Sequence, residues 1–189
     1  MASIIATKYQ DICAGHRVVG HEGKCRHLHG HNYRIHFFCK ETVQPTFFDE
    51  GDDVITIGKK RRVLAPPAQT GLDDLGRVID FTVIGEQLCN WVENNWDHKF
   101  LHWSEDTMIQ DMQRAAKARM DNSHFEDPAY FDSKTQLESY VELPFNPTAE
   151  NLAAYLVDVV GPAQLKGLGV TLVRVVIEET RKCSVEYAI

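Results

Sequence analysis

The sequence lacks several features that would place the protein outside the ordinary globular class. No apolar stretch reaches the roughly 18–20 residues that a membrane-spanning helix needs, and the N-terminal MASIIATKYQ does not have the pattern of a signal peptide. Internal repeats and low-complexity runs are also missing. Positive charge is in deficit, since 20 Lys and Arg face 27 Asp and Glu and give a net charge of −7. This balance argues against a general binder of nucleic acid or anionic membranes, but it allows a local basic pocket for a small anion.

Cysteine is sparse and scattered. The five cysteines lie at positions 13, 25, 39, 89 and 183 of a 189-residue chain. An odd number without regular spacing is typical of reduced thiols, so we expect a cytoplasmic protein. Four of them are expected to be small buried residues, whereas Cys25 lies in a polar loop. With 43% hydrophobic and 25% charged residues, the chain is long enough to form one domain with its own core over residues 1–189.

The pattern of the remaining chain predicts an α+β fold with the order β-β-α-α-β-β. Four segments have the composition of strands: 4–18, 31–40, 170–180 and 183–188. Two segments have apolar residues at helical spacing: 80–95 and 148–160. Asp80 or Thr82 can cap the first helix, and we expect Gly161 and Pro162 to end the second.

Two long stretches do not fit this compact plan and are interpreted as insertions. Residues 41–77 contain DEGDD, KKRR and APPAQTG, and are expected to form a strand pair or an exposed loop. Residues 103–142 contain a predicted helix over 105–120. Its apolar face is thin, with Ile109, Met112 and Ala116, so we expect it to pack on the surface or at a subunit contact.

Five of the nine histidines lie within HEGKCRHLHGHNYRIHF, which begins at His21. On a strand, His29 and His31 share one face, whereas His36 has the opposite parity. His16 in AGHRV or His27 could supply a third ligand, and spacing alone does not choose between them. Three imidazoles without a fourth protein ligand are typical of a catalytic zinc.

Other interpretations of the cluster stay open from spacing alone. Cys25 and His27 could complete a structural zinc site with four ligands. The cluster could also be a surface loop with fortuitous histidines.

Six motifs occur in one order: AGHRV, C-x-x-x-HGHNY, VIDF, WDHKFLH, NPTAENLA and VVIEET. Together they resemble the 6-pyruvoyltetrahydropterin synthase / 6-carboxytetrahydropterin synthase (QueD) family, over roughly residues 8–38, 77–101 and 143–187. The resemblance implies a tunnelling fold (T-fold), a four-stranded antiparallel sheet with two helices on one face. It also implies edge-to-edge barrels, stacked as a dimer of trimers into a hexamer with active sites between subunits.

The resemblance also implies the site residues. The zinc ligands would be His16, His29 and His31, and the groups that move protons would be Cys25, Asp97 and His98. Cys25 has Lys24 and Arg26 on either side, and positive neighbours favour a thiolate. An aspartate beside an imidazole fixes its tautomer and supports its charged form.

Glu179 is the carboxylate that the resemblance assigns to the pterin. Its strand parity continues the more apolar face of residues 170–180, where a carboxylate needs a partner. The adjacent N–H donors of a pterin ring would match two carboxylate oxygens. Glu150, in PTAEN, is expected to serve the helix dipole instead.

The implied substrate is 7,8-dihydroneopterin triphosphate. The three-residue gap in CRHLHGH resembles the QueD branch, which releases acetaldehyde and triphosphate and leaves 6-carboxy-5,6,7,8-tetrahydropterin, on the way to 7-deazaguanine nucleosides such as queuosine. The alternatives are 6-pyruvoyltetrahydropterin synthase and a non-catalytic zinc-binding paralog. Four cations are candidates for phosphate contacts: Arg26, Lys99, Arg181 and Lys182.

Overall fold

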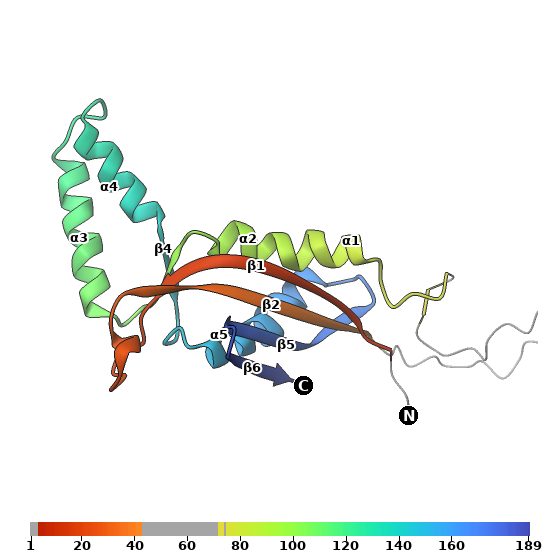
Figure 1. The fold of residues 1–189 in the computed structure, drawn as a ribbon. Helices are drawn as coiled ribbons and strands as arrows, with labels where there is room; N and C mark the ends of the chain where they lie inside the picture. The colour runs from red at the N-terminus through yellow and green to blue at the C-terminus, as the bar shows by residue number, and fades with distance from the viewer. Residues whose placement is uncertain (1–3, 43–71, 74) are drawn as a thin grey trace, which may run out of the picture.

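The computed structural model describes residues 4–42, 72–73 and 75–189 (Figure 1). In chain order its elements are β1 (Ala6–His16), the 3₁₀ turn η1 (Lys24–Arg26), β2 (His29–Glu41), α1 (Phe81–Ile84), the π-helical η2 (Gly85–Cys89), α2 (Asn90–Trp96), β3 (Phe100–Trp103), α3 (Thr107–Asp121), α4 (Pro128–Glu138), β4 (Tyr140–Leu143), α5 (Ala149–Tyr155), the π-helical η3 (Leu156–Val160), α6 (Gly161–Gln164), β5 (Val170–Thr180) and β6 (Cys183–Ala188). The predicted β-β-α-α-β-β core is present, and β5 and β6 have the predicted bounds.

The sheet is larger than predicted. Among the described residues, six strands pair in the order β4-β3-β1-β2-β5-β6. Strands β1, β2, β5 and β6 are antiparallel neighbours, as expected. The short strands β3 and β4 extend the β1 edge by parallel pairing, so the sheet is mixed. The prediction of a four-stranded antiparallel sheet missed them because each has only four residues, too few for a clear alternation.

One face of the sheet is covered by the two predicted helices. Strand residues such as Ile35 and Ile177 form one buried cluster with Leu88 of the first helix and Leu152 of the second. Asp80 caps the first helix by accepting a hydrogen bond from the Thr82 N–H. Burial of this apolar surface is the main stabilising contribution to the domain.

The second helix does not end at Gly161 and Pro162, contrary to the prediction. It widens into the π-helical turn η3 and continues through α6 to Gln164. Pro162 lies in the first turn of α6, where a missing N–H is tolerated. Gly161 is required by packing, because an added Cβ would lie 2.8 Å from the Cβ of Leu172.

The stretch 103–142 contains a helical hairpin that stands away from the sheet (Figure 1). The predicted helix is α3, and it is followed by α4, which we did not predict. Asp106 caps α3 by accepting hydrogen bonds from the N–H groups of Met108 and Ile109. Its other oxygen lies 2.7 Å from the Nε of Arg17, directly after β1.

The other predicted insertion, residues 41–77, falls mostly outside the described residues. At its far end, Arg77 pairs with Asp73 and Asp80. Among the helices that the structure describes, none is long and apolar enough to cross a membrane.

Candidate metal centre and adjoining cavities

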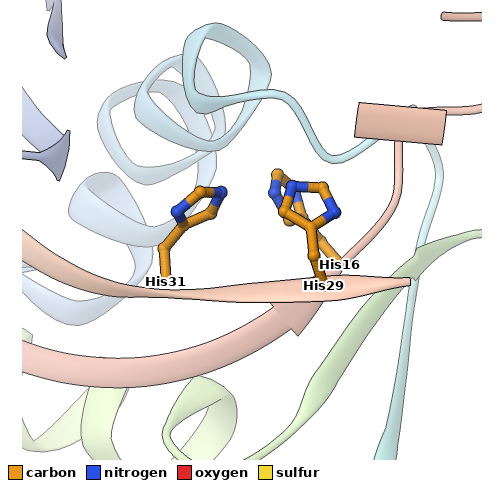
Figure 2. Close-up of side chains that lie close together, drawn as sticks. All are labelled: His16, His29 and His31. Carbon is orange, nitrogen blue, oxygen red and sulfur yellow. The ribbon is translucent and has the colours of Figure 1, made fainter. Parts of the chain in front are cut away.

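Three histidines gather at one end of the helix-covered face. His16 ends β1 opposite His29 of β2, and His31 lies two residues further along β2. Figure 2 shows the three rings on the same side of the two strands. One ligand nitrogen from each lies within 4.8 Å of the other two. The structure therefore brings together the predicted set, and it takes His16 rather than His27 as the third member.

Backbone carbonyl groups hold two of the three rings through their Nδ1 atoms. The Nδ1 of His16 lies 2.7 Å from the carbonyl oxygen of Pro147, and the Nδ1 of His29 lies 2.8 Å from that of His27. A carbonyl accepts only, so each Nδ1 carries the proton and each Nε2 presents a lone pair. Both Nε2 atoms are buried and have no hydrogen-bond partner. Unsatisfied buried acceptors are costly, and a metal ion would satisfy them, as carbonyl-oriented histidines do in metalloproteins.

The pKa values also favour the neutral ligand form. Burial lowers the pKa of His16 to about 4, although the Pro147 carbonyl opposes this shift. Burial also lowers the pKa of His31, against the attraction of Glu179. Near neutral pH these imidazoles are therefore unprotonated, as metal binding requires.

Glu179 lies beside this group on β5. Its Oε1 is 3.6 Å from the Nε2 of His16 and 3.6 Å from that of His31. The predicted parity of the strand is correct, since Ile177 is buried on this face. Glu178 faces the other way and lies 2.7 Å from the Nε2 of His36.

Cys25 lies in η1 and lines a cavity of about 450 Å³ next to His16 and Glu179. The same cavity is lined by Glu150, in the first turn of α5. The sequence predicts for Glu150 only an interaction with the helix dipole. Thr148 accepts a hydrogen bond from the Asn151 N–H as the N-cap of α5, and this start places Glu150 at the cavity. The position of this carboxylate two residues after the N-cap is the sequence feature that could have identified Glu150 as a cavity residue.

Asp97 and His98 form a hydrogen-bonded pair beside a second, larger cavity of about 1240 Å³. The Oδ2 of Asp97 lies 2.7 Å from the Nδ1 of His98, and its Oδ1 accepts a hydrogen bond from the Cys13 N–H. Burial raises the pKa of Asp97, but the hydrogen bonds from Cys13 and His98 outweigh it and leave the pKa below its usual range. His98 is 80% exposed and has a φ of 56°, a conformation that residues other than glycine rarely adopt.

Within one chain, the predicted catalytic groups line two different cavities. Cys25 lines the smaller one, whereas Asp97 and His98 line the larger one. Glu179 lines both. Of the four candidate phosphate contacts, Lys99 and Arg181 line the larger cavity.

A sheet with one helix-covered face and three imidazoles at its strand ends defines an α+β protein of the tunnelling-fold type. The chain belongs to the 6-pyruvoyl tetrahydropterin synthase family, whose model matches residues 5–189. It is similar to a 6-carboxy-5,6,7,8-tetrahydropterin synthase of Rickettsia bellii, with 28% identity over 184 residues that cover 97% of this chain and 99% of the relative. The same named enzyme of Rickettsia felis is 27% identical over 184 residues, with 97% and 99% covered. These relatives therefore have nearly the same length as this chain, including its two long stretches.

Solved structures support the fold. An uncharacterized protein from Wolinella succinogenes superposes with a TM-score of 0.70 at 20% identity, covering 100% of this chain and 99% of that one. The 6-pyruvoyl tetrahydropterin synthase of Caenorhabditis elegans superposes with a TM-score of 0.52 at 18% identity, covering 100% and 97%. At these identities the likeness concerns the fold alone.

Proposed function

We propose that the protein is a 6-carboxy-5,6,7,8-tetrahydropterin synthase. It would convert 7,8-dihydroneopterin triphosphate and water to 6-carboxy-5,6,7,8-tetrahydropterin, acetaldehyde and triphosphate, a step toward 7-deazaguanine nucleosides such as queuosine. The observation that carries this proposal is the pair of buried, unpartnered Nε2 atoms of His16 and His29, which converge with His31. The names of the Rickettsia relatives favour this reaction within the family.

Zinc fits the three-imidazole donor set, and His16, His29 and His31 would hold it. When bound, zinc would supply a Lewis acid that binds the side-chain hydroxyls of the substrate and acidifies the neighbouring carbon. Cys25 would take up or return a proton from its position in the same cavity. Asp97 orients the ring of His98 through its Nδ1, which makes His98 a candidate for transferring a proton to a departing group.

A homo-oligomer would bring the divided groups together. Cys25 and the Asp97–His98 pair line different cavities of one chain, so a complete site could form where the larger cavity of one subunit meets the smaller cavity of its neighbour. The sheet ends in β4 on one side and β6 on the other, and open edges of this kind favour edge-to-edge pairing. We therefore propose a ring of subunits, with a hexamer built as a dimer of trimers.

Two carboxylates could accept the donors of the pterin ring. Glu179 is our predicted partner, and it lines both cavities. Glu150 is a second carboxylate on the smaller cavity. A pterin bound there would present its adjacent N–H donors to one of them through charge-assisted hydrogen bonds.

The deciding experiment is incubation of the purified, zinc-loaded protein with 7,8-dihydroneopterin triphosphate, with products identified by mass spectrometry. We expect 6-carboxy-5,6,7,8-tetrahydropterin with an equal amount of acetaldehyde. Accumulation of 6-pyruvoyltetrahydropterin would assign the protein to the other branch of the family. Unchanged substrate, with metal bound, would identify a non-catalytic zinc-binding paralog.

A further inference from the structure

The loop between β1 and β2, residues 17–28, carries Cys25 but buries little of its own surface. Its sequence, RVVGHEGKCRHL, contains two glycines and four charged residues. From residue 20 to residue 28, every residue except Cys25 is exposed. Segments with few buried contacts open at a small cost in free energy. The position of the Cys25 thiol therefore depends on the hydrogen bonds that hold this loop.

The half-buried side chain of Asn146 joins the loop to the segment before α5. Its Oδ1 accepts a hydrogen bond of 2.9 Å from the Val19 N–H, and its Nδ2 donates one of 2.8 Å to the Val19 carbonyl oxygen. A single amide group thus satisfies both backbone groups of one residue, which fixes the position and the orientation of the loop at that point. Among the described residues, the other hydrogen bonds of residues 18–26 stay within the loop.

The anchored residue is next to the one that holds Cys25. The N–H of Val18 donates a hydrogen bond of 2.8 Å to the carbonyl oxygen of Cys25. Val18 and Cys25 both line the smaller cavity. The thiol is therefore connected to Asn146 through one short stretch of backbone, Val18 and Val19.

Asn146 is itself fixed, and its neighbour holds a candidate metal ligand. The carbonyl oxygen of Asn146 accepts a hydrogen bond of 2.9 Å from the Nδ2 of Asn151 in α5. The carbonyl oxygen of the next residue, Pro147, lies 2.7 Å from the Nδ1 of His16. Two consecutive residues thus hold the loop that carries the thiol and the ring of His16, so they set the placement of one relative to the other.

We propose that Asn146 is a positioning residue, which keeps the thiol of Cys25 at the cavity beside His16 by holding the loop 17–28. The chemical part of this role rests on the proposed function, in which Cys25 transfers a proton. The hydrogen bonds that hold the loop do not depend on that function. A neutral amide suits the role because it offers a donor and an acceptor on one planar group, whereas a carboxylate offers acceptors alone.

The test compares the purified, zinc-supplied full chain with Asn146→Ala, which removes both hydrogen bonds, and with Asn146→Asp, which keeps an acceptor but loses the donor. Asn122→Ala is the control, because the Nδ2 of Asn122 donates to the Ala118 carbonyl within the hairpin. Native-state hydrogen exchange measures opening of the loop. Alkylation by iodoacetamide, resolved by peptide mapping, measures access to Cys25, with the exposed thiol of Cys13 as internal reference.

Loss of two neutral hydrogen bonds shifts an opening equilibrium by about tenfold or more. We therefore expect the amides of residues 18–26 to exchange about tenfold faster in Asn146→Ala, and Cys25 to be alkylated faster by a similar factor. Asn146→Asp should show a smaller increase in both rates. Asn122→Ala should match wild type, and the alkylation of Cys13 should be the same in all four proteins.

Turnover of 7,8-dihydroneopterin triphosphate separates positioning from a general effect on the fold. In Asn146→Ala we expect kcat to fall by about tenfold while KM changes little, because a group that transfers protons acts in the chemical step. In a Cys25→Ala background, the same change at Asn146 should not lower kcat further. Residues that act as one unit are non-additive in this way.

Loop exchange and Cys25 alkylation at wild-type rates in Asn146→Ala would overturn the positioning role. An equal loss of kcat with and without the Cys25 thiol would also overturn it, since Asn146 would then act elsewhere. If Asn146→Ala does not fold, Asn146→Asp gives the same comparison. Wild-type protein without turnover would overturn the proposed function, and the exchange and alkylation rates would still decide whether Asn146 holds the loop.

Discussion

The two faces of the sheet use the same residue types for different purposes. On the face away from the helices, His36 and Glu178 form a hydrogen bond of 2.7 Å, and Arg34 pairs with Asp11. On the covered face, His16 and His31 lie 3.6 Å from Glu179, and buried imidazole nitrogens have no partner. Polar groups that satisfy one another need no ligand, whereas a group of converging acceptors does. The difference between the two faces therefore marks His16, His29 and His31 as a candidate metal site.

The strongest test of which histidines bind the metal is to remove histidines from each face of the sheet. We expect His29→Ala and His31→Ala to lose nearly all bound zinc, because each removes one of only three imidazole ligands. Metal analysis of the purified proteins checks this. His36→Ala and His27→Ala are the controls and should retain the metal. A full equivalent of zinc in both His29→Ala and His31→Ala would show that the ligand set is wrong.

Cys25→Ala should retain zinc and the fold but lose turnover by about 10²–10⁴-fold, the usual contribution of a general acid or base. The reason is that the thiol lines the cavity of the metal group without belonging to it. Steady-state kinetics and metal analysis on the same sample separate the two effects. Cys13→Ala removes an exposed thiol of β1 that does not line the cavity of Cys25, and it is the matched variant for the loss of a sulfur atom. Turnover like that of wild type in Cys25→Ala would exclude a chemical role for this thiol.

The adjacent pair Glu178 and Glu179 tests pterin recognition. Glu179→Gln replaces an acceptor with a donor that would face the donors of the pterin. One charge-assisted hydrogen bond contributes about 1.5–3 kcal/mol, and the loss of pterin binding free energy should exceed that amount. Titration of a non-reactive pterin into the zinc-loaded variants measures this. Glu178→Gln should have little effect, since its carboxylate serves His36. If Glu150→Gln is the most damaging of the three, the pterin carboxylate is on α5 instead.

Acid should destabilise the metal-free protein because His16, on the helix-covered face, resists protonation when it is buried. His16 protonates near pH 6.5 when unfolded but only near pH 4 when folded, because burial lowers its pKa. Between these values the unfolded state binds more protons, so stability is present above pH 6.5 and falls progressively as the pH is lowered toward 4. Urea unfolding across this range should show a weaker pH dependence for His16→Gln than for wild type. Parallel curves for the two proteins would contradict the assignment.

The smallest effect is expected on the open face. Arg34 and Asp11 pair on the surface, and their side chains are 43% and 58% exposed. Solvent screens such exposed pairs, so they contribute little to stability. Denaturant unfolding of Asp11→Asn should therefore give a free energy of unfolding close to that of wild type, and a large loss of stability would contradict the assignment of this pair to an exposed face.

The sequence predicted the parts of the fold that have a strong local pattern. Alternation along 170–180 placed Glu178 and Glu179 on opposite faces, as found. The spacing of two residues between His29 and His31 placed both on one face of a strand, as found. It could not predict the continuation of the second helix, because Gly161 is selected by its contact with Leu172 in a distant strand. The third metal ligand required the pairing of β1 with β2, and before that contact is known His27 and His16 are equivalent candidates. The place of Glu150 at the cavity has the same cause, since it depends on how α5 packs against β5 and β6, which are distant in the sequence.

The ion pair between Arg17 and Asp106 connects the end of β1 to the start of α3. Arg17 directly follows His16, and Asp106 begins the hairpin of α3 and α4. The end of β1 that carries His16 and the hairpin are therefore joined through a carboxylate that is almost fully buried. Segments joined by such a contact tend to open together in native-state hydrogen exchange. The amides of α3 should therefore gain protection when metal is added, even though the hairpin contributes no ligand to the group.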